Sequence, residues 1–88
     1  MKVEFKNSFS KDLKKLKDEK LKNQVRELIE LTEQVQNLQQ LENIKKLRGT
    51  DRYYRIKLGD YRIGLILESG TLIFVRFLHR KDIYRYFP

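Results

Sequence analysis

The sequence predicts an α+β domain in which a helical hairpin packs on a small antiparallel sheet. Apolar residues recur every three or four positions between residues 9 and 35, the period of amphipathic helices. From residue 53 onward β-branched and aromatic residues are frequent, and Gly59-Asp60 and Ser69-Gly70 mark two turns. At 88 residues the chain is expected to form a single domain, residues 1–88.

A short strand and a first helix are expected at the amino end. Residues 2–6 alternate, with Val3 and Phe5 on one side, which is typical of a strand. Apolar residues then recur at spacings of four and three and predict a short amphipathic helix. These are Phe9, Leu13 and Leu16. Asn7 or Ser8 could cap it.

A second helix follows the charged turn at residues 17–20. Its apolar stripe is widened by Ile29 and Leu31 and fades near residues 36–40. The stripe consists of Leu21, Val25, Leu28, Thr32 and Val35. A coiled coil is the alternative, but the heptad-like stretch spans barely two heptads, so packing on a sheet is favoured.

Three strands are expected at about 53–58, 61–68 and 71–78, after Gly49 has ended any helical turn. Ile83 and Phe87, four residues apart, predict a final helical turn. The expected order is an N-terminal strand, a helical hairpin, a three-stranded antiparallel meander that completes a small sheet, and a short C-terminal helix.

Composition excludes several classes of site. The absence of cysteine excludes a disulfide framework, a thiolate nucleophile and the usual zinc-finger spacings. A single histidine, His79, cannot form a metal cluster, so neither a metal nor a cofactor is expected. There is no long apolar run and no cationic leader, so a cytoplasmic protein with no membrane contact is expected.

The net charge of +8 is concentrated in the second half of the chain. Residues 1–44 carry nine Lys/Arg against eight Asp/Glu, whereas residues 45–88 carry eleven against four. Arginine outnumbers lysine seven to four in the second half, and arginine suits forked contacts to phosphate. A polyanion partner, nucleic acid above all, is favoured over a merely solvated basic surface.

The first hairpin of the meander gathers cations on one face. A two-residue loop at Gly59-Asp60 pairs Lys57 with Arg62 and Arg55 with Gly64. Alternation then directs apolar residues toward the helices, namely Tyr54, Ile56, Leu58, Ile63, Leu65 and Leu67. Opposed like charges weaken a sheet, so the Lys57–Arg62 pair indicates an anion site. Gly64 leaves room there for a close approach to the backbone.

The second hairpin is expected to have a three-residue loop containing Gly70. A two-residue loop would bury Arg76 beside Ile63, which is costly. The longer loop moves Arg76 to the basic side, where Arg80 could join it, and sends other residues inward, namely Ile73, Val75 and Phe77. The five cations Arg55, Lys57, Arg62, Arg76 and Arg80 are then expected to ring one concave surface beneath the terminal tyrosines.

The run KKLRGTDRYYRIKLGDYRIGLIL and the ending LHRKDIYRYFP together resemble the RelE/ParE superfamily of type II toxin–antitoxin toxins. The resemblance covers the whole chain. It implies either a ribosome-dependent endoribonuclease that cleaves translated mRNA or a ParE-type inhibitor of DNA gyrase that cuts nothing. The RelE-type nuclease is favoured, and an inactive basic nucleic-acid-binding domain is the third alternative.

The resemblance also implies a site and a metal-independent reaction. A ribose 2′-OH would attack the adjacent phosphate and leave a cyclic phosphate and a free 5′-OH. The catalytic candidates are Lys57, Arg62, Arg80 and Tyr84. The candidates for binding RNA or phosphate are Arg55, Arg76, Lys45, Lys46 and Arg48. In this scheme Arg62 steadies the phosphate, Arg80 stabilises or protonates the leaving 5′-oxygen, and Tyr84 stacks on a base or orients the 2′-OH.

The general base is the open question of this site. Arg55 stands where RelE nucleases have a lysine, and arginine stays protonated. Lys57 is the lysine that remains on this face, and it is the candidate base. The intrinsic pKa of a histidine side chain suits a base better than that of lysine, but alternation turns His79 away from the basic face, which favours a structural role.

The implied partners are a cognate antitoxin and, for the nuclease, the ribosome and mRNA. DNA gyrase would replace the ribosome in the alternative. Operator DNA would be bound only through the antitoxin.

Overall fold

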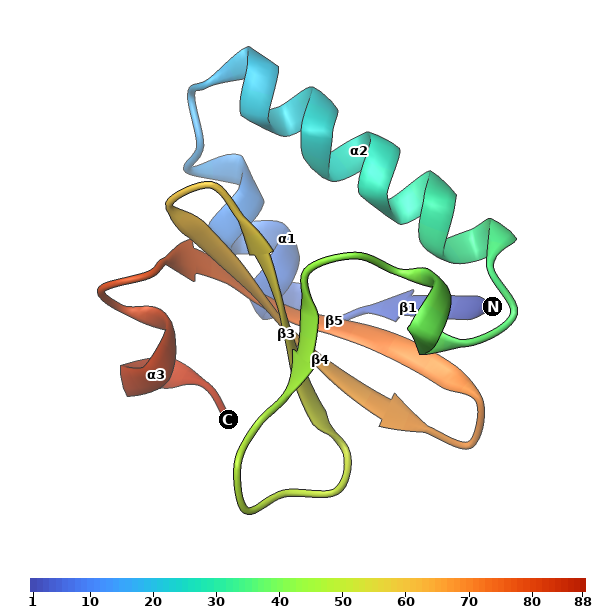
Figure 1. The fold of residues 1–88 in the computed structure, drawn as a ribbon. Helices are drawn as coiled ribbons and strands as arrows, with labels where there is room; N and C mark the ends of the chain where they lie inside the picture. The colour runs from blue at the N-terminus through green and yellow to red at the C-terminus, as the bar shows by residue number, and fades with distance from the viewer.

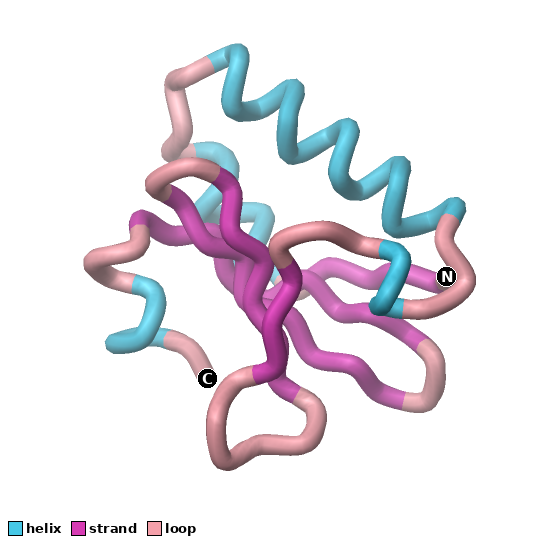
Figure 2. The backbone as a smooth tube through the Cα atoms, viewed as in Figure 1, coloured by secondary structure: helices cyan, strands magenta, loops and turns pink.

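Five strands form one mixed sheet in the computed structural model, which describes all 88 residues (Figures 1 and 2). The order across the sheet is β1-β5-β4-β3-β2. Every neighbouring pair is antiparallel except β1 and β5, which are parallel. The strands are β1 (Lys2–Phe5), β2 (Ile44–Lys46), β3 (Tyr53–Leu58), β4 (Tyr61–Glu68) and β5 (Thr71–His79).

The predicted helical hairpin is confirmed as α1 (Asn7–Lys14) and α2 (Glu19–Gln34), and α2 runs diagonally along the top of the view in Figure 1, beside the sheet. Asp18 caps α2, since its carboxylate accepts a hydrogen bond from the Leu21 N–H at 3.1 Å. The predicted cap of α1 is wrong: Lys6 precedes that helix, and no side chain caps it. A 3₁₀ turn, η1 (Leu38–Gln40), and a short helix, α3 (Ile83–Tyr86), complete the structure.

The core lies between the helical hairpin and one face of the sheet, which we call the helix face. Eleven buried residues form it: Phe9, Leu16, Val25, Val35, Leu41, Ile56, Ile63, Leu65, Leu72, Phe74 and Phe77. Thr32 is fully buried on α2, and its hydroxyl donates to the Leu28 carbonyl at 2.8 Å, so this polar group is not left unpaired. The opposite side of the sheet is the open face.

The register of the β3–β4 hairpin is the predicted one. Lys57 opposes Arg62 and Arg55 opposes Gly64, around the Gly59-Asp60 loop. Gly59 has a φ of +59° at the first loop position, the conformation that favours glycine in such a turn. Because directly opposed residues point to the same side, the inward and outward sets of these two strands are also confirmed.

The second hairpin differs from the prediction in its loop. Glu68 opposes Thr71, so Ser69 and Gly70 form a two-residue loop. A bulge near Gly64 and Leu65 then shifts the register and inserts one extra residue, Val75.

The bulge divides β5 into two halves with different parity. Leu72 and Phe74 are buried on the helix face in the first half, so the predicted inward placement of Ile73 and Val75 is wrong. Phe77 points inward and Arg76 opposes Gly64, as expected, because the bulge supplies the odd residue that had been assigned to the loop.

The strand β2 was not predicted from the sequence. It pairs with β3 and makes the sheet one strand wider, placing Lys45 opposite Arg55. Three residues are too few for an alternating pattern to be recognised, since Ile44 alone is apolar in this strand.

Candidate nucleic-acid interface

Five cations share the open face of the sheet through strand register. Lys45, Arg55, Gly64 and Arg76 occupy one cross-strand row, and Lys57 and Arg62 occupy the next. We call Lys45, Arg55, Lys57 and Arg62 the basic cluster. No acidic residue occupies either row on these strands, so their charges stay uncompensated within the rows.

Arg62 turns toward the β3–β4 loop. Its Nη1 donates to the carbonyls of Gly59 at 2.8 Å and Tyr61 at 2.9 Å. Two fixed hydrogen bonds hold the guanidinium at this end of the hairpin and leave its remaining N–H groups available to an anion.

Arg80 reaches the same loop from the end of β5. Its backbone N–H donates to the Asp60 carbonyl at 2.7 Å, and its Nε lies 3.9 Å from the Asp60 carboxylate. The Arg80 side chain is 58% exposed, so this ion pair is a weak one that an incoming phosphate could replace. The structure thus brings Arg62 and Arg80 to one loop although 18 positions separate them in the sequence.

The tail, residues 80–88, returns to the open face. Ile83 and Phe87 are buried, as expected, while Tyr84 is 59% exposed. The room above Gly64 is filled by the Phe87 ring: a Cβ at position 64 would lie 2.6 Å from the Phe87 Cγ. The expectation that this gap admits a ligand is therefore wrong, because the chain's own tail occupies it.

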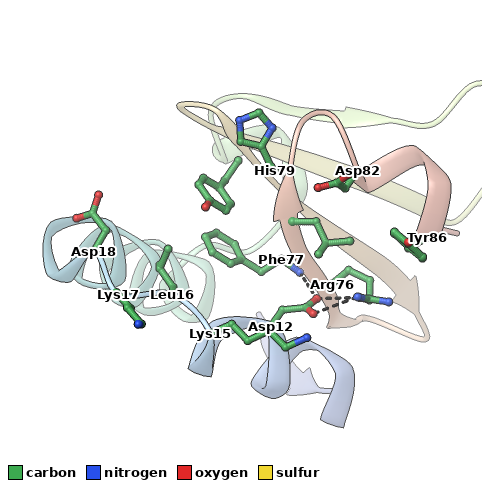
Figure 3. A pocket seen from close by; sticks show the side chains of 12 residues that line it. Asp12, Lys15, Leu16, Lys17, Asp18, Arg76, Phe77, His79, Asp82 and Tyr86 are labelled. Carbon is green, nitrogen blue, oxygen red and sulfur yellow. Dashed lines mark hydrogen bonds and ion pairs between the residues drawn. The ribbon is translucent and has the colours of Figure 1, made fainter.

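Arg76 forms an ion pair with Asp12 on α1 (Figure 3). The prediction that Arg76 is one of the free cations of the site is therefore wrong. The Arg76 Nε and Nη2 donate to the two Asp12 carboxylate oxygens at 2.7 and 3.0 Å. The Asp12 side chain is only 5% exposed and also accepts the Phe77 N–H at 3.0 Å. The Arg76 guanidinium lies 5.6 Å from the centre of the Tyr86 ring. The sequence prediction missed Asp12, whose position on the buried stripe of α1 was the available signal.

His79 lies on the helix face, as strand parity predicted. It opposes Tyr61, and the two rings meet edge to face with centroids 5.6 Å apart. Its Nδ1 accepts the Lys81 N–H at 3.1 Å, which fixes the ring and assigns the proton to the other nitrogen when the imidazole is neutral.

Two further candidates, Lys46 and Arg48, lie outside the two rows that hold the basic cluster. Lys46 opposes Tyr54, a residue of the helix face, although its side chain is exposed. Arg48 is exposed in the turn between β2 and β3.

One cation that the sequence did not single out, Arg52, precedes β3. Its guanidinium lies 3.4 Å from the Tyr53 hydroxyl and 3.9 Å from the Glu68 carboxylate. The hydrogen bond to Tyr53, with the nearby charges, raises the pKa of Arg52 above its usual value.

A cavity of about 750 Å³ lies beside the α1–α2 turn and the second half of β5 (Figure 3). Its lining includes Asp12, Arg76, His79 and Tyr86, but no member of the basic cluster. The expected ring of five cations around one concavity is therefore not formed. The basic cluster is an open surface, which suits an extended polyanion better than a small ligand.

No group of three or more His, Asp or Glu side chains is arranged to hold a metal ion. No helix combines the length and apolar character needed to cross a membrane.

Comparison with known proteins places this geometry among toxins. Residues 3–84 match the family model described as ParE toxin of type II toxin–antitoxin system, parDE. Toxin RelE3 of Methanocaldococcus jannaschii is 44% identical over 89 residues, which cover 100% of each chain.

Solved structures agree in fold. A RelB–RelE antitoxin–toxin complex from Methanococcus jannaschii contains a chain that is 41% identical, with a TM-score of 0.84 over 98% of this chain and 100% of that one. An archaeal RelE–RelB complex from Pyrococcus horikoshii, 21% identical, matches 93% of this chain and 97% of its own with a TM-score of 0.74. The second likeness is one of fold alone.

Proposed function

The chain belongs to the RelE/ParE superfamily of type II toxins, and on that premise we propose that it is a ribosome-dependent endoribonuclease that cleaves translated mRNA. The observation that carries the proposal is the register of β3 and β4. It aligns Arg55, Lys57 and Arg62 on the open face, with Arg80 tied to the loop that joins the two strands.

The proposed chemistry is transfer of a phosphoryl group within the RNA. The 2′-oxygen attacks the adjacent phosphorus as its proton passes to a base, for which Lys57 is the candidate. The bond from phosphorus to the 5′-oxygen breaks, and that oxygen takes up a proton. The products are a 2′,3′-cyclic phosphate and a 5′-hydroxyl.

Fixed cations stabilise the transition state of this reaction more than its ground state, because negative charge accumulates on the phosphoryl oxygens. Arg62, with Arg55 beside it in register, would neutralise those oxygens. Arg80 would stabilise the leaving 5′-oxygen, and Tyr84 would stack on a base or orient the 2′-OH. The reaction in this scheme is independent of a metal ion, since these cations neutralise the phosphate.

The proposed partner is a cognate antitoxin. The relative from Methanococcus jannaschii was crystallised with RelB. We expect a segment of the cognate antitoxin to cover the basic cluster of this chain. Masking of four exposed or half-exposed cations calls for an acidic segment that folds on binding. The complex would reach operator DNA through the antitoxin.

A second candidate, inhibition of DNA gyrase without cleavage, is favoured by one observation: the matching family model is that of ParE toxins. In that case the basic cluster would bind a protein surface or DNA. Lys57 would not have to act as a base, because no bond is cleaved.

Controlled induction in cells separates the two candidates. The nuclease predicts loss of protein synthesis and new 5′ ends inside coding sequence, with normal supercoiling by purified gyrase. The inhibitor predicts DNA breaks and blocked supercoiling with intact mRNA. If the protein binds RNA in a salt-sensitive way but causes neither mRNA cleavage nor gyrase inhibition, both candidates are contradicted. The chain would then be an inactive binding domain.

A further inference from the structure

The position of the tail depends on packing at a few points. Its helix, α3, has four residues, and so short a helix is not stable alone. Ile83 is 0% exposed and Phe87 is 2% exposed, so these two side chains anchor its ends. A third attachment is the hydrogen bond from the Arg80 N–H to the Asp60 carbonyl.

Phe87 stands directly on Gly64. A Cβ at Gly64 would lie 2.6, 2.7 and 2.8 Å from Cγ, Cδ2 and Cδ1 of the ring. These atoms form the root of a buried ring, so they cannot move aside as the tip of a flexible side chain could. The ring also meets Tyr53 edge to face, with centroids 5.7 Å apart.

The backbone does not require glycine at this position. Gly49, Gly59 and Gly70 all have a positive φ, whereas Gly64 does not. Alanine is therefore compatible with the strand itself, and the close approach of Phe87 is what excludes it.

Gly64 is also the centre of the cationic row, between Arg55 on β3 and Arg76 on β5. A ring seated there fixes the tail relative to the strands that carry the basic cluster. Tyr84 lies in the sequence between the two buried anchors, and Arg80 lies just before them.

We propose that the Gly64–Phe87 contact is a positioning device that holds Tyr84 and Arg80 in register with Arg55, Lys57 and Arg62 for RNA cleavage. The inference rests on the proposed nuclease function. When catalytic groups come from separate elements, a shift of about 1 Å in one of them can lower the reaction rate by up to about a hundredfold. The contact thus acts through Tyr84 and Arg80, and Phe87 itself need not touch RNA.

Two variants and one control test the contact. Gly64→Ala displaces the ring by a single methyl group, and Phe87→Ala removes the ring. Phe5→Ala is the matched control, because it deletes a phenyl ring that packs on Phe9 and Phe74 at the helix face, away from the tail.

The first readout is independent of activity. The chain has no tryptophan, so Tyr84→Trp introduces a single tryptophan on α3 that can be excited separately from the tyrosines. Its fluorescence anisotropy should fall when Gly64→Ala or Phe87→Ala is added and remain high with Phe5→Ala.

The second readout is single-turnover cleavage of mRNA on programmed ribosomes, measured without the tryptophan. Gly64→Ala and Phe87→Ala should lower the cleavage rate about tenfold to a hundredfold at saturating enzyme, with ribosome affinity unchanged. Phe5→Ala should match the wild type once the folded fraction is equalised by circular dichroism.

The inference is overturned if Gly64→Ala cleaves as fast as the wild type, or if its loss of rate only parallels a loss of folded protein. Unchanged anisotropy at position 84 in both single variants also overturns it. A wild type that cleaves nothing overturns the proposed function and this inference together, whereas equal rates in active proteins overturn the inference alone.

Discussion

Lys57 and Arg62 face each other across the β3–β4 ladder, although opposed like charges cost a sheet some tenths of a kcal/mol up to about 1 kcal/mol. Arg62 moves its charge toward the hairpin loop by donating to two carbonyls, which lessens the repulsion. Retention of such a pair is understandable if both cations serve an anionic ligand.

Replacement of Arg62 or Arg80 by alanine should abolish toxicity and leave the melting temperature nearly unchanged. Neither side chain belongs to the core, so its removal should not affect packing. Loss of one charge that stabilises the transition state should lower the cleavage rate by about 10²–10³-fold. Growth after induction and circular-dichroism melting measure the two effects. Arg85→Ala, an exposed change on α3, is the control. Unfolding of both arginine variants would show that these residues support the fold instead.

Two substitutions at Lys57 separate charge from proton transfer. Lys57→Ala should slow cleavage about 10²–10⁴-fold if the amine is the base. Lys57→Arg keeps the positive charge but cannot accept a proton, so it should be equally slow. Antitoxin binding, followed by calorimetry, should persist in both. Full activity of either variant would remove Lys57 from the base role.

Among the elements, α1 is docked on β5 by polar contacts. β1 pairs with β5 only as far as Phe74, so the following half of β5 has an unpaired edge. The Ser8 hydroxyl donates to the Val75 carbonyl there, and the Asp12 carboxylate accepts the Phe77 N–H. Side chains of α1 thus take over the hydrogen bonds that a longer β1 would make, which protects the edge.

Asp12→Ala should destabilise the fold by about 3 kcal/mol or more, because it leaves the Arg76 guanidinium and the Phe77 N–H without their acceptor. Urea denaturation measures the free energy of unfolding, with Lys11→Ala on the exposed side of α1 as the control. Arg76→Ala should be destabilising as well, and a double-mutant cycle should reveal strong coupling between the two residues. Independent, additive effects would contradict the docking role.

For the whole molecule, the distribution of charge decides binding more than its total. The lysines of residues 1–44 are nearly balanced by acidic residues, whereas the basic cluster belongs to the cationic second half. Affinity for single-stranded RNA should fall with salt. Removal of one cation that neutralises a phosphate should reduce the slope of log K against log[salt] by about 0.7.

Arg55→Ala should therefore lower that slope, and Lys20→Ala on α2 should leave it unchanged. Fluorescence titration of a labelled oligonucleotide between 50 and 200 mM salt, about the range in which such effects are large, measures both. Equal slopes for the two variants would show that RNA does not contact the basic cluster.

The helical hairpin and the β3–β4 register could be predicted from the sequence, and this register places Arg55, Lys57 and Arg62 on the same side of the sheet. These features follow from periodicity and turn chemistry, which act between residues close in the chain. The three-dimensional fold was needed to identify the partner of Arg76, the bulge at Val75 and the packing of Phe87 on Gly64. Those contacts join residues 23 or more positions apart or depend on a neighbouring strand, and no local pattern encodes which distant group will fill a gap or meet a charge.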